Sequence, residues 1–351
     1  MSHSVFTHPW LSGLFGDPGM AEVLSPERQM SHMLGFEAAW SRACGKAGLF
    51  DATTAEEAAK AIESAEIDLA DIAAGMAQDG VPIPRLVKQL KAIAPADAVH
   101  KGATSQDVVD TALVLTLREA SFLIAGRLME LETYLKALEE QFGDAPLMGR
   151  TRMQAATEMT VRDRLLTWRL PLADHLKTLD QKRADVEKVQ IGGASGDRKA
   201  LGDKAGAVVA EVAKALDLAP TDKAWHTMRH GIAGYASFLS LITGSLGKMG
   251  QDIVLMAQQG IEEVAISGAG GSSAMPHKQN PVSAELLVTL ARYNATQVSA
   301  MHHALVHEQE RSGAAWSLEW MVLPQMLMAT GRSLAMAIEL VQNIERLGRA
   351  Q

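Results

Sequence analysis

Apolar side chains recur every three or four positions along much of the chain, and the clearest run extends from Asp107 to Phe142. No proline interrupts it, and its apolar positions are Val109, Leu113, Leu117, Ala120, Ile124, Leu128, Leu131, Leu135 and Leu138. A stripe with this period over about 36 residues predicts a helix of about 54 Å. A compact monomer of 351 residues has a radius of gyration of only about 20 Å. We therefore expect a helix as long as the molecule.

More long helical patterns follow this one, and they cover 160–189, 228–264, 282–308 and 317–347. Pro171 and Pro324 lie inside two of them and predict kinks. No convincing run of alternating β-branched residues, the usual signal for a strand, accompanies them. The predicted fold class is all-α, an elongated bundle of long helices.

Three glycines, Gly244, Gly247 and Gly250, lie three residues apart in the pattern over 228–264. This spacing is compatible with close packing against a neighbouring helix and with a bend beside a site. The residues alone leave both interpretations open.

The first 95 residues contain shorter helical patterns, which are broken by DPG at 17–19 and VPIP at 81–84. We predict a smaller helical domain over 1–95 and a bundle domain over 96–351, joined near Ala94 and Pro95. Long apolar stripes need neighbours that cover them, and one chain offers few such neighbours. We therefore expect a homo-oligomer.

Charge and composition exclude several classes of partner. The net charge is −8, from 33 basic and 41 acidic side chains, and no basic block exists that would follow a phosphate backbone, so nucleic acid is not an expected partner. The single cysteine, Cys44, excludes an intramolecular disulfide. Apolar runs such as 253–257 are far shorter than the ~18 residues of a membrane span, and the N-terminal stretch lacks the features of a signal peptide. We expect a cytoplasmic protein without a membrane partner.

A loop rich in glycine and polar residues, GAGGSSAMPHKQNP, covers 268–281. Asn280 and Pro281 form a good helix start, with Asn280 as N-cap and Pro281 at the first helical position. The loop therefore brings polar groups, with the charge of Lys278, to the positive end of a helix, where an anion binds well. A plain surface loop with a helix cap would explain Asn280 and Pro281 but not Ser272, Ser273 and Lys278.

A second polar cluster, HKGATSQD over 100–107, precedes the longest helical pattern. Thr104 and Asp107 fit the outline of a capping box, so a simple helix start is one interpretation. Capping uses only one hydroxyl and leaves His100, Gly102 and Ser105 unexplained. Free backbone N–H groups there would form another anion site.

A third cluster, GRTRMQ over 149–154, lies between two long helical patterns. Arg150 and Arg152 are each able to hold a carboxylate through two hydrogen bonds, although exposed arginines often only solvate a turn.

Other motifs fail on inspection. GAGGSS is not a dinucleotide-binding G-x-G-x-x-G, because Ser273 occupies the last position. His226 and His230, like His303 and His307, lie four residues apart and could share a helix face, but without a third ligand they read as ordinary helix histidines. We predict no metal and no cofactor.

Taken together, GSSAMPHKQNP, HKGATSQD and GRTRMQ resemble the fumarase/aspartase superfamily. Within it the chain is most similar to the family of bacterial 3-carboxy-cis,cis-muconate cycloisomerases, with the adenylosuccinate lyases second. The resemblance implies a homotetramer whose central domains form a core of twenty helices, with each active site assembled from three subunits. Members usually carry a small domain after the bundle, and we expect that domain to be reduced or absent.

The resemblance also implies roles for individual residues. Ser272 would be the acid in the lactonising direction and the base in the reverse direction, with Lys278 and Asn280 lowering its pKa. The residues expected to bind a small-molecule tricarboxylate substrate are His100, Thr104, Ser105, Arg150, Arg152, Gln154, Arg229, Ser273 and Met275.

One departure from the lyase pattern favours cycloisomerisation. Many lyase members have histidine where Arg152 stands, and that histidine is linked to protonation of the leaving group. A carboxylate, with a reference pKa of roughly 4, leaves or adds without a proton. Ser312 and Trp320 also replace polar groups of the adenylosuccinate lyases. The alternatives are adenylosuccinate lyase, another β-eliminating lyase, or an inactive structural protein like the lens crystallins of this superfamily.

Overall fold

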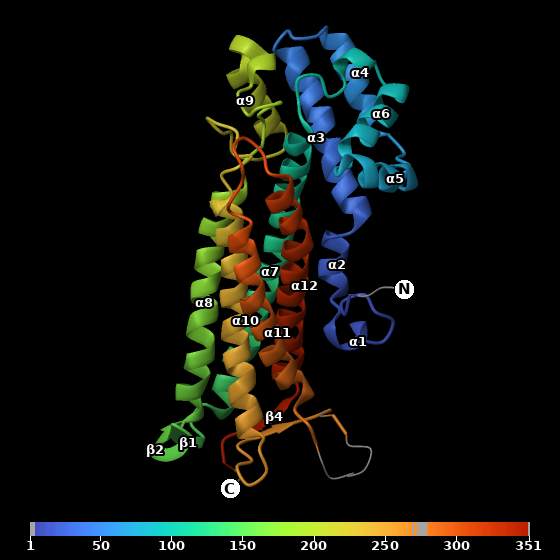
Figure 1. Cartoon of the computed structure of the whole chain (residues 1–351). Helices are drawn as coiled ribbons and strands as arrows, with labels where there is room; N and C mark the ends of the chain where they lie inside the picture. The colour runs from blue at the N-terminus through green and yellow to red at the C-terminus, as the bar shows by residue number, and fades with distance from the viewer. Residues whose placement is uncertain (1–3, 269, 272–278, 350–351) are drawn as a thin grey trace.

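The structure, a computed structural model, describes residues 4–268, 270–271 and 279–349. Within this part of the chain, long helices, each antiparallel to the one before it in sequence, form a closed bundle in which each packs against the next around a ring (Figure 1). The ring consists of α7 (Ser105–Phe142), α8 (Val161–Val186), α10 (His230–Met256), α11 (Val282–His303) and α12 (Gly313–Gln342). The prediction of an elongated, all-α bundle is confirmed.

The longest helix, α7, begins where the sequence predicts. Thr104 is its N-cap, and a capping box links Thr104 to Asp107. The apolar stripe of α7 is buried, from Leu117 through Leu128 to Leu138. Its 38 residues extend over about 57 Å at 1.5 Å per residue. The two ends of the bundle are therefore far apart.

The predicted ends of other helices need correction. Helix α10 ends at Met256, and α12 ends at Gln342, although helical patterns extend to 264 and 347. The residues beyond these ends form strands β3 (Val264–Ile266) and β4 (Ile344–Leu347), which pair antiparallel. A second pair, β1 (Pro146–Thr151) and β2 (Gln154–Thr160), forms a hairpin between α7 and α8. Short strands that pair with each other at the end of a bundle carry no long alternating pattern, so the sequence does not reveal them.

Pro171 and Pro324 lie inside α8 and α12, as predicted. Helix α12 is apolar enough over an 18-residue window, with a mean hydropathy of 1.2, to match a membrane span by composition. However, 72% of that window is buried within the bundle, so its neighbours in the ring account for its apolar character.

Shorter helices precede the bundle. In Figure 1 those that follow residue 26 gather beside its upper end, and the first two lie lower along its side. They are α1 (Ser12–Phe15), α2 (Pro18–Val23), α3 (Pro26–Lys46), α4 (Ala52–Glu63), α5 (Leu69–Asp79) and α6 (Ile83–Ile93). Short 3₁₀ helices cover Ala96–Ala98 and Lys199–Lys204, and α9 covers Ala205–Ala215.

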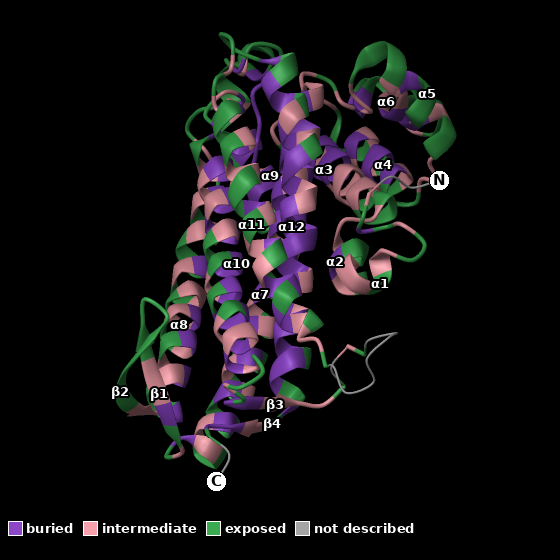
Figure 2. Ribbon diagram, turned by 60° about the horizontal axis from the view of Figure 1, so that its bottom comes forward, coloured by how far each residue is buried: buried purple, intermediate pink, exposed green. Residues whose placement is uncertain are grey.

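A second apolar core forms where α3 packs on the first turns of α7 and on α9. It contains Trp40 from α3, Val108 from α7 and Val212 from α9, all buried (Figure 2). Residues before and after Pro95 share this core, so the packing is continuous across the predicted boundary. The division into two domains at residue 95 stays a prediction.

Close packing accounts for two of the three spaced glycines. A Cβ atom on Gly247 would lie 2.5 Å from the Cβ of Ala291, and one on Gly250 would lie 2.5 Å from the carbonyl oxygen of Ala284. Both contacts are with α11. A Cβ on Gly244 would meet no atom within 4 Å. The glycines at 247 and 250 thus allow α10 and α11 to approach closely.

We expect Gly250→Ala to lower the free energy of unfolding by about 1–3 kcal/mol, because the added methyl group forces the two helices apart. Gly244→Ala is the matched control on the same helix. It should be neutral or raise stability by up to about 1 kcal/mol, since alanine favours helix over glycine. Urea denaturation followed by circular dichroism measures both variants. Equal stability of the two variants would contradict the packing argument.

Candidate active site

The predicted site residues that the structure describes fall at opposite ends of the bundle. His100, Thr104, Ser105 and Arg229 lie at the end where α7 begins, while Arg150, Arg152, Gln154 and Asn280 lie where α7 ends (Figure 1). Ser272, Ser273, Met275 and Lys278 lie outside the described residues. Since α7 separates the two groups by about 57 Å, one copy of the chain cannot place both groups around one small molecule.

At the first end, the carboxylate of Asp107 organises several loops. Its Oδ1 accepts hydrogen bonds from Gly192 N (2.8 Å) and His226 Nε2 (2.9 Å). Its Oδ2 accepts hydrogen bonds from Gly193 N (2.9 Å) and Thr104 N (3.0 Å). Asp107 is fully buried. The same carboxylate that caps α7 thereby fixes the loop at 190–198 and the loop that precedes α10.

One turn further along α7, Asp110 forms a second buried centre. Its carboxylate accepts hydrogen bonds from Gln106 and Gln190 (both 3.1 Å), from Trp316 Nε1 (3.0 Å) and from Arg229 (2.7 and 3.2 Å). These partners come from α7, from the loop after α8, from α12 and from the residue before α10. The centre therefore ties together elements that are distant in sequence.

The predicted role of Arg229 needs correction. Its side chain is almost completely buried, and its guanidinium donates to Asp110 and to Glu319 of α12. The ring of Trp225 covers it, at 4.9 Å from the guanidinium carbon to the ring centroid. Burial alone lowers the pKa of Arg229, but the two carboxylates raise it above its ordinary value. All these contacts lie within one chain, so Arg229 holds the bundle end together and is not available to a substrate.

Glu319 experiences the opposite balance. Burial raises the pKa of its carboxyl group, Arg229 offsets part of this shift, and the nearby Asp110 adds to it. A single guanidinium thus faces two buried carboxyl groups and donates two hydrogen bonds to each.

His100 has a left-handed backbone, with φ of 56°, and its Nδ1 lies 2.5 Å from Oε1 of the buried Glu37 in α3. Burial lowers the pKa of His100, but the charge and the hydrogen bond of Glu37 outweigh this effect and raise it. Thr104 and Ser105 are partly exposed beside it, at the positive end of α7. This arrangement is suited to an anionic group.

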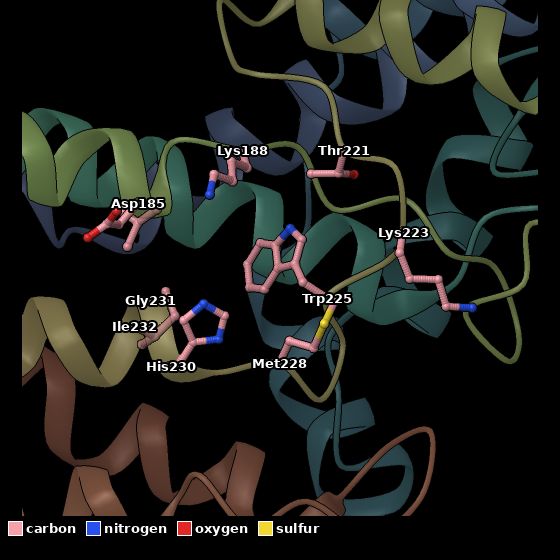
Figure 3. Close-up of a pocket in the computed structure, with 10 residues that line it drawn as sticks. Asp185, Lys188, Thr221, Lys223, Trp225, Met228, His230, Gly231 and Ile232 are labelled. Carbon is pink, nitrogen blue, oxygen red and sulfur yellow. The ribbon is translucent and has the colours of Figure 1, made fainter.

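Two cavities lie on either side of the loop that precedes α10. The larger, of about 460 Å³, is lined by His226, Gly196 and Glu310 among others. The smaller, of about 150 Å³, lies against Trp225, Lys188 and His230 (Figure 3). In Figure 3 the side chain of Lys223 extends away from the smaller cavity, and its Nζ donates to Gly196 O at 2.8 Å beside the larger one.

At the other end of the bundle, the hairpin of β1 and β2 carries three of the predicted residues. The strand register shifts between Met148 and Arg150, and this bulge directs Arg150 toward the base of the hairpin. There its guanidinium donates to Oε2 of Glu263 at 2.7 Å. Glu263 is buried. Arg150 therefore anchors the hairpin, and its contact with substrate stays a prediction.

The hairpin tip has an unusual turn. Arg152 and Met153 both have positive φ, 50° and 66°, in the two-residue loop between the paired residues Thr151 and Gln154. Such turns favour Asn and Gly. Arg152 and Gln154 are exposed, and among the described residues Arg152 has no ion-pair partner. The tip thus offers a cation and an amide to whatever docks against it.

The predicted N-cap needs correction as well. Helix α11 begins at Val282, and Pro281 is its N-cap, without a side-chain cap. The backbone of Asn280 instead exchanges hydrogen bonds with Gly270, at 2.8 and 3.0 Å. This bridge joins the two ends of the loop at 268–281. Asn280 therefore pairs with Gly270 through its backbone and does not cap α11.

The comparisons with known proteins agree with this architecture. A sequence model of a family described as lyase matches residues 16–298. The chain belongs to the fumarase/aspartase superfamily. It is 38% identical to the 3-carboxy-cis,cis-muconate cycloisomerase of Pseudomonas aeruginosa, over 93% of this chain and 73% of that protein. It is 35% identical to the enzyme of the same name from Acinetobacter baylyi, over 95% of this chain and 76% of that protein.

One solved structure has nearly the same fold as this chain. The 3-carboxy-cis,cis-muconate lactonizing enzyme of Pseudomonas putida superposes with a TM-score of 0.89 at 36% identity, and the match covers 96% of this chain and 77% of that one. The likeness shows the bundle and its order of helices.

The sequence analysis missed several residues at the two ends of the bundle. His226 precedes α10 in a loop, so it shares no helix face with His230, and its environment had no local signal. The sequence around Glu263 likewise gives no local signal of its ion pair with Arg150. Arg311, which donates to Gln106 Oε1 at 3.0 Å, extends the first network into the loop before α12.

We expect Arg150→Met to lower the free energy of unfolding by about 2–3 kcal/mol, because it removes the closer guanidinium partner of the buried Glu263 and leaves only Arg349, whose Nε lies 3.8 Å from Oε1. Amide hydrogen exchange should accelerate across 146–160. Arg162→Met is the control, since its ion pairs with Glu139 and Asp144 are more exposed and contribute about 1 kcal/mol or less. If both variants unfold at the same denaturant concentration, Arg150 is not the anchor.

Proposed function

We propose that the chain catalyses the intramolecular addition of a carboxylate in 3-carboxy-cis,cis-muconate, which gives carboxymuconolactone, a step of protocatechuate degradation. The observation that carries this proposal is the 35–38% identity to enzymes named for that activity, over more than nine tenths of the chain. The exposed Arg152 supports it, because it replaces the histidine that would protonate a poor leaving group.

The chemistry needs one proton and no cofactor. A carboxylate oxygen of the substrate forms a bond to a carbon of the double bond, and the electron pair moves onto the neighbouring carbon and its carboxylate. The hydroxyl group of Ser272 then donates a proton to that carbon, and water returns the proton to the serine. A serine alkoxide is stable only in a positive local potential, which Lys278 and the loop amides of 268–281 would supply.

The substrate is a trianion, and the protein carries a net charge of −8. Binding therefore depends on local donors. The proposed ligands are Thr104 and Ser105 at the positive end of α7, together with His100, Ser273 and Met275. Arg152 and Gln154 at the hairpin tip complete the set. Arg150 and Arg229 are left out, since each is held by a buried carboxylate.

The separation of these groups supports a shared site. Thr104 and Arg152 lie at opposite ends of a helix about 57 Å long, so both reach one substrate only if different copies of the chain supply them. Antiparallel packing of copies brings unlike ends together. We propose a cytoplasmic homotetramer in which each site combines residues from several subunits.

The direct test is an assay of the triacid. Purified protein should abolish the ultraviolet absorbance of the conjugated diene, and Ser272→Ala should lower kcat by about 10³-fold or more through loss of the proton donor. Adenylosuccinate and a panel of other dicarboxylates and tricarboxylates serve as competing substrates. Cleavage of adenylosuccinate with no change in the diene would indicate a β-eliminating lyase, and inactivity on the whole panel would indicate a structural protein.

Mixing two inactive variants tests the shared site. Ser272→Ala changes the proposed proton donor and Ser105→Ala a proposed substrate ligand at the start of α7, and each should be nearly inactive alone. If every site draws the two residues from different copies, joint refolding of equal amounts should restore about a quarter of the wild-type activity. The wild type refolded in parallel is the control. A mixture as inactive as its components would argue against sites that combine copies.

A further inference from the structure

His226 is buried in the loop before α10, and only one of its two ring nitrogens has a partner among the described residues. Its exposed fraction is 3%. Nε2 bonds to Asp107, while Nδ1 is shielded from solvent and has no hydrogen-bond partner. Burial of a polar atom without a partner is unfavourable, so such an atom in a well-packed region calls for an explanation.

The hydrogen bonds that Asp107 accepts determine which ring nitrogen of His226 carries a proton. A carboxylate only accepts hydrogen bonds, and that of Asp107 already accepts from the backbone of Thr104, Gly192 and Gly193. Nε2 of His226 must therefore carry a proton. The imidazole is held in one orientation with Nδ1 directed away from Asp107, which is the arrangement in which a carboxylate positions a functional histidine.

The neighbouring backbone is shaped to the free edge of the ring. A Cβ on Gly192 would lie 2.6 Å from Cε1 of His226, and one on Gly196, where φ is 74°, would lie 3.5 Å from Nδ1. The glycine turn at 192–196 thus packs on the ring edge without covering it with a side chain. It borders the cavity of about 460 Å³ that His226 also lines.

The charged groups around this cavity come from each element that borders it. Lys223 is anchored to Gly196 O at 2.8 Å, and Asp197 and Glu310 are exposed at the rim. Asp107 lies on the far side of the ring. Thr104 is bonded to the same Asp107, so the cavity is next to the residues proposed to bind substrate carboxylates.

We propose that His226 binds a carboxylate of the substrate through Nδ1, as an imidazolium whose charge Asp107 supports from the opposite nitrogen. The proposal rests on the proposed function in that the ligand is a polycarboxylate. A carboxylate offers no proton, so the hydrogen bond requires one on Nδ1, and the resulting bond is charge-assisted. His226 would supply at this end of the bundle a cation that Arg229 cannot offer.

Two substitutions at this position separate binding from structure, because each keeps one nitrogen. His226→Gln keeps an N–H near the place of Nε2, where it still donates to Asp107, and removes Nδ1. His226→Asn keeps an N–H near the place of Nδ1 and loses the bond to Asp107. A binding role predicts that KM rises about 10- to 100-fold in the Gln variant and less than about 10-fold in the Asn variant, which keeps a neutral donor but loses the charge, with a smaller change in kcat. A purely structural role predicts the reverse order.

Binding of propane-1,2,3-tricarboxylate, an unreactive tricarboxylate, provides a readout that does not depend on catalysis. Calorimetric titration should give the same order of Kd as of KM, and His230→Gln, the same change four residues away, should match the wild type. If only one variant folds, it still decides: a wild-type Kd in His226→Gln, or a Kd raised more than about 10-fold in His226→Asn, overturns the proposal. Failure of the wild type to convert the triacid would reject the proposed function, while the order of Kd values would still test His226.

Discussion

The length of α7 is the constraint on which the rest of the molecule depends. A helix of 38 residues keeps the loops at its two ends about 57 Å apart, and the other helices of the ring pack along its axis, some parallel and some antiparallel to it. Polar chemistry cannot sit in the middle of such a bundle without interrupting apolar stripes, so it collects at the ends. The proposed site, which combines groups from both ends, would therefore need a second copy, and the exposed helix faces would provide a surface on which copies pack.

Buried carboxylates fix the geometry of both ends. Asp107 and Asp110 hold the loops at the start of α7, and Glu263 holds the hairpin at the opposite end. Each is buried and surrounded by N–H donors, so removal of a single donor leaves a charge in a medium that solvates it poorly. These contacts hold the backbone of the loops at 190–198 and of the hairpin to the ends of the bundle.

The helices and the cap of α7 could be predicted because their signals are local: a period of 3.6 residues and a pair three positions apart, Thr104 and Asp107. The roles of the arginines could not, because their partners are distant in sequence. Arg150 meets Glu263 113 residues later, and Arg229 meets Asp110 119 residues earlier. The pairing of β3 with β4 could not be predicted for the same reason. A charged residue in a polar motif looks free until its tertiary partner is known.

This distinction also narrows which cation faces the substrate. In an acidic protein most arginines find carboxylates within the fold, and those of positions 150 and 229 do so through buried partners. Arg152 differs, since the hairpin holds it at an exposed tip in a left-handed conformation that residues other than Gly and Asn adopt at some cost. A strained turn that presents an unpaired guanidinium gives no benefit to the isolated chain. In the proposed shared site, the tip would enter a site in another copy and the guanidinium would meet a substrate carboxylate. A reaction whose attacking group is itself a carboxylate uses that charge directly, whereas a reaction that expels an amine would require a proton that arginine does not give up.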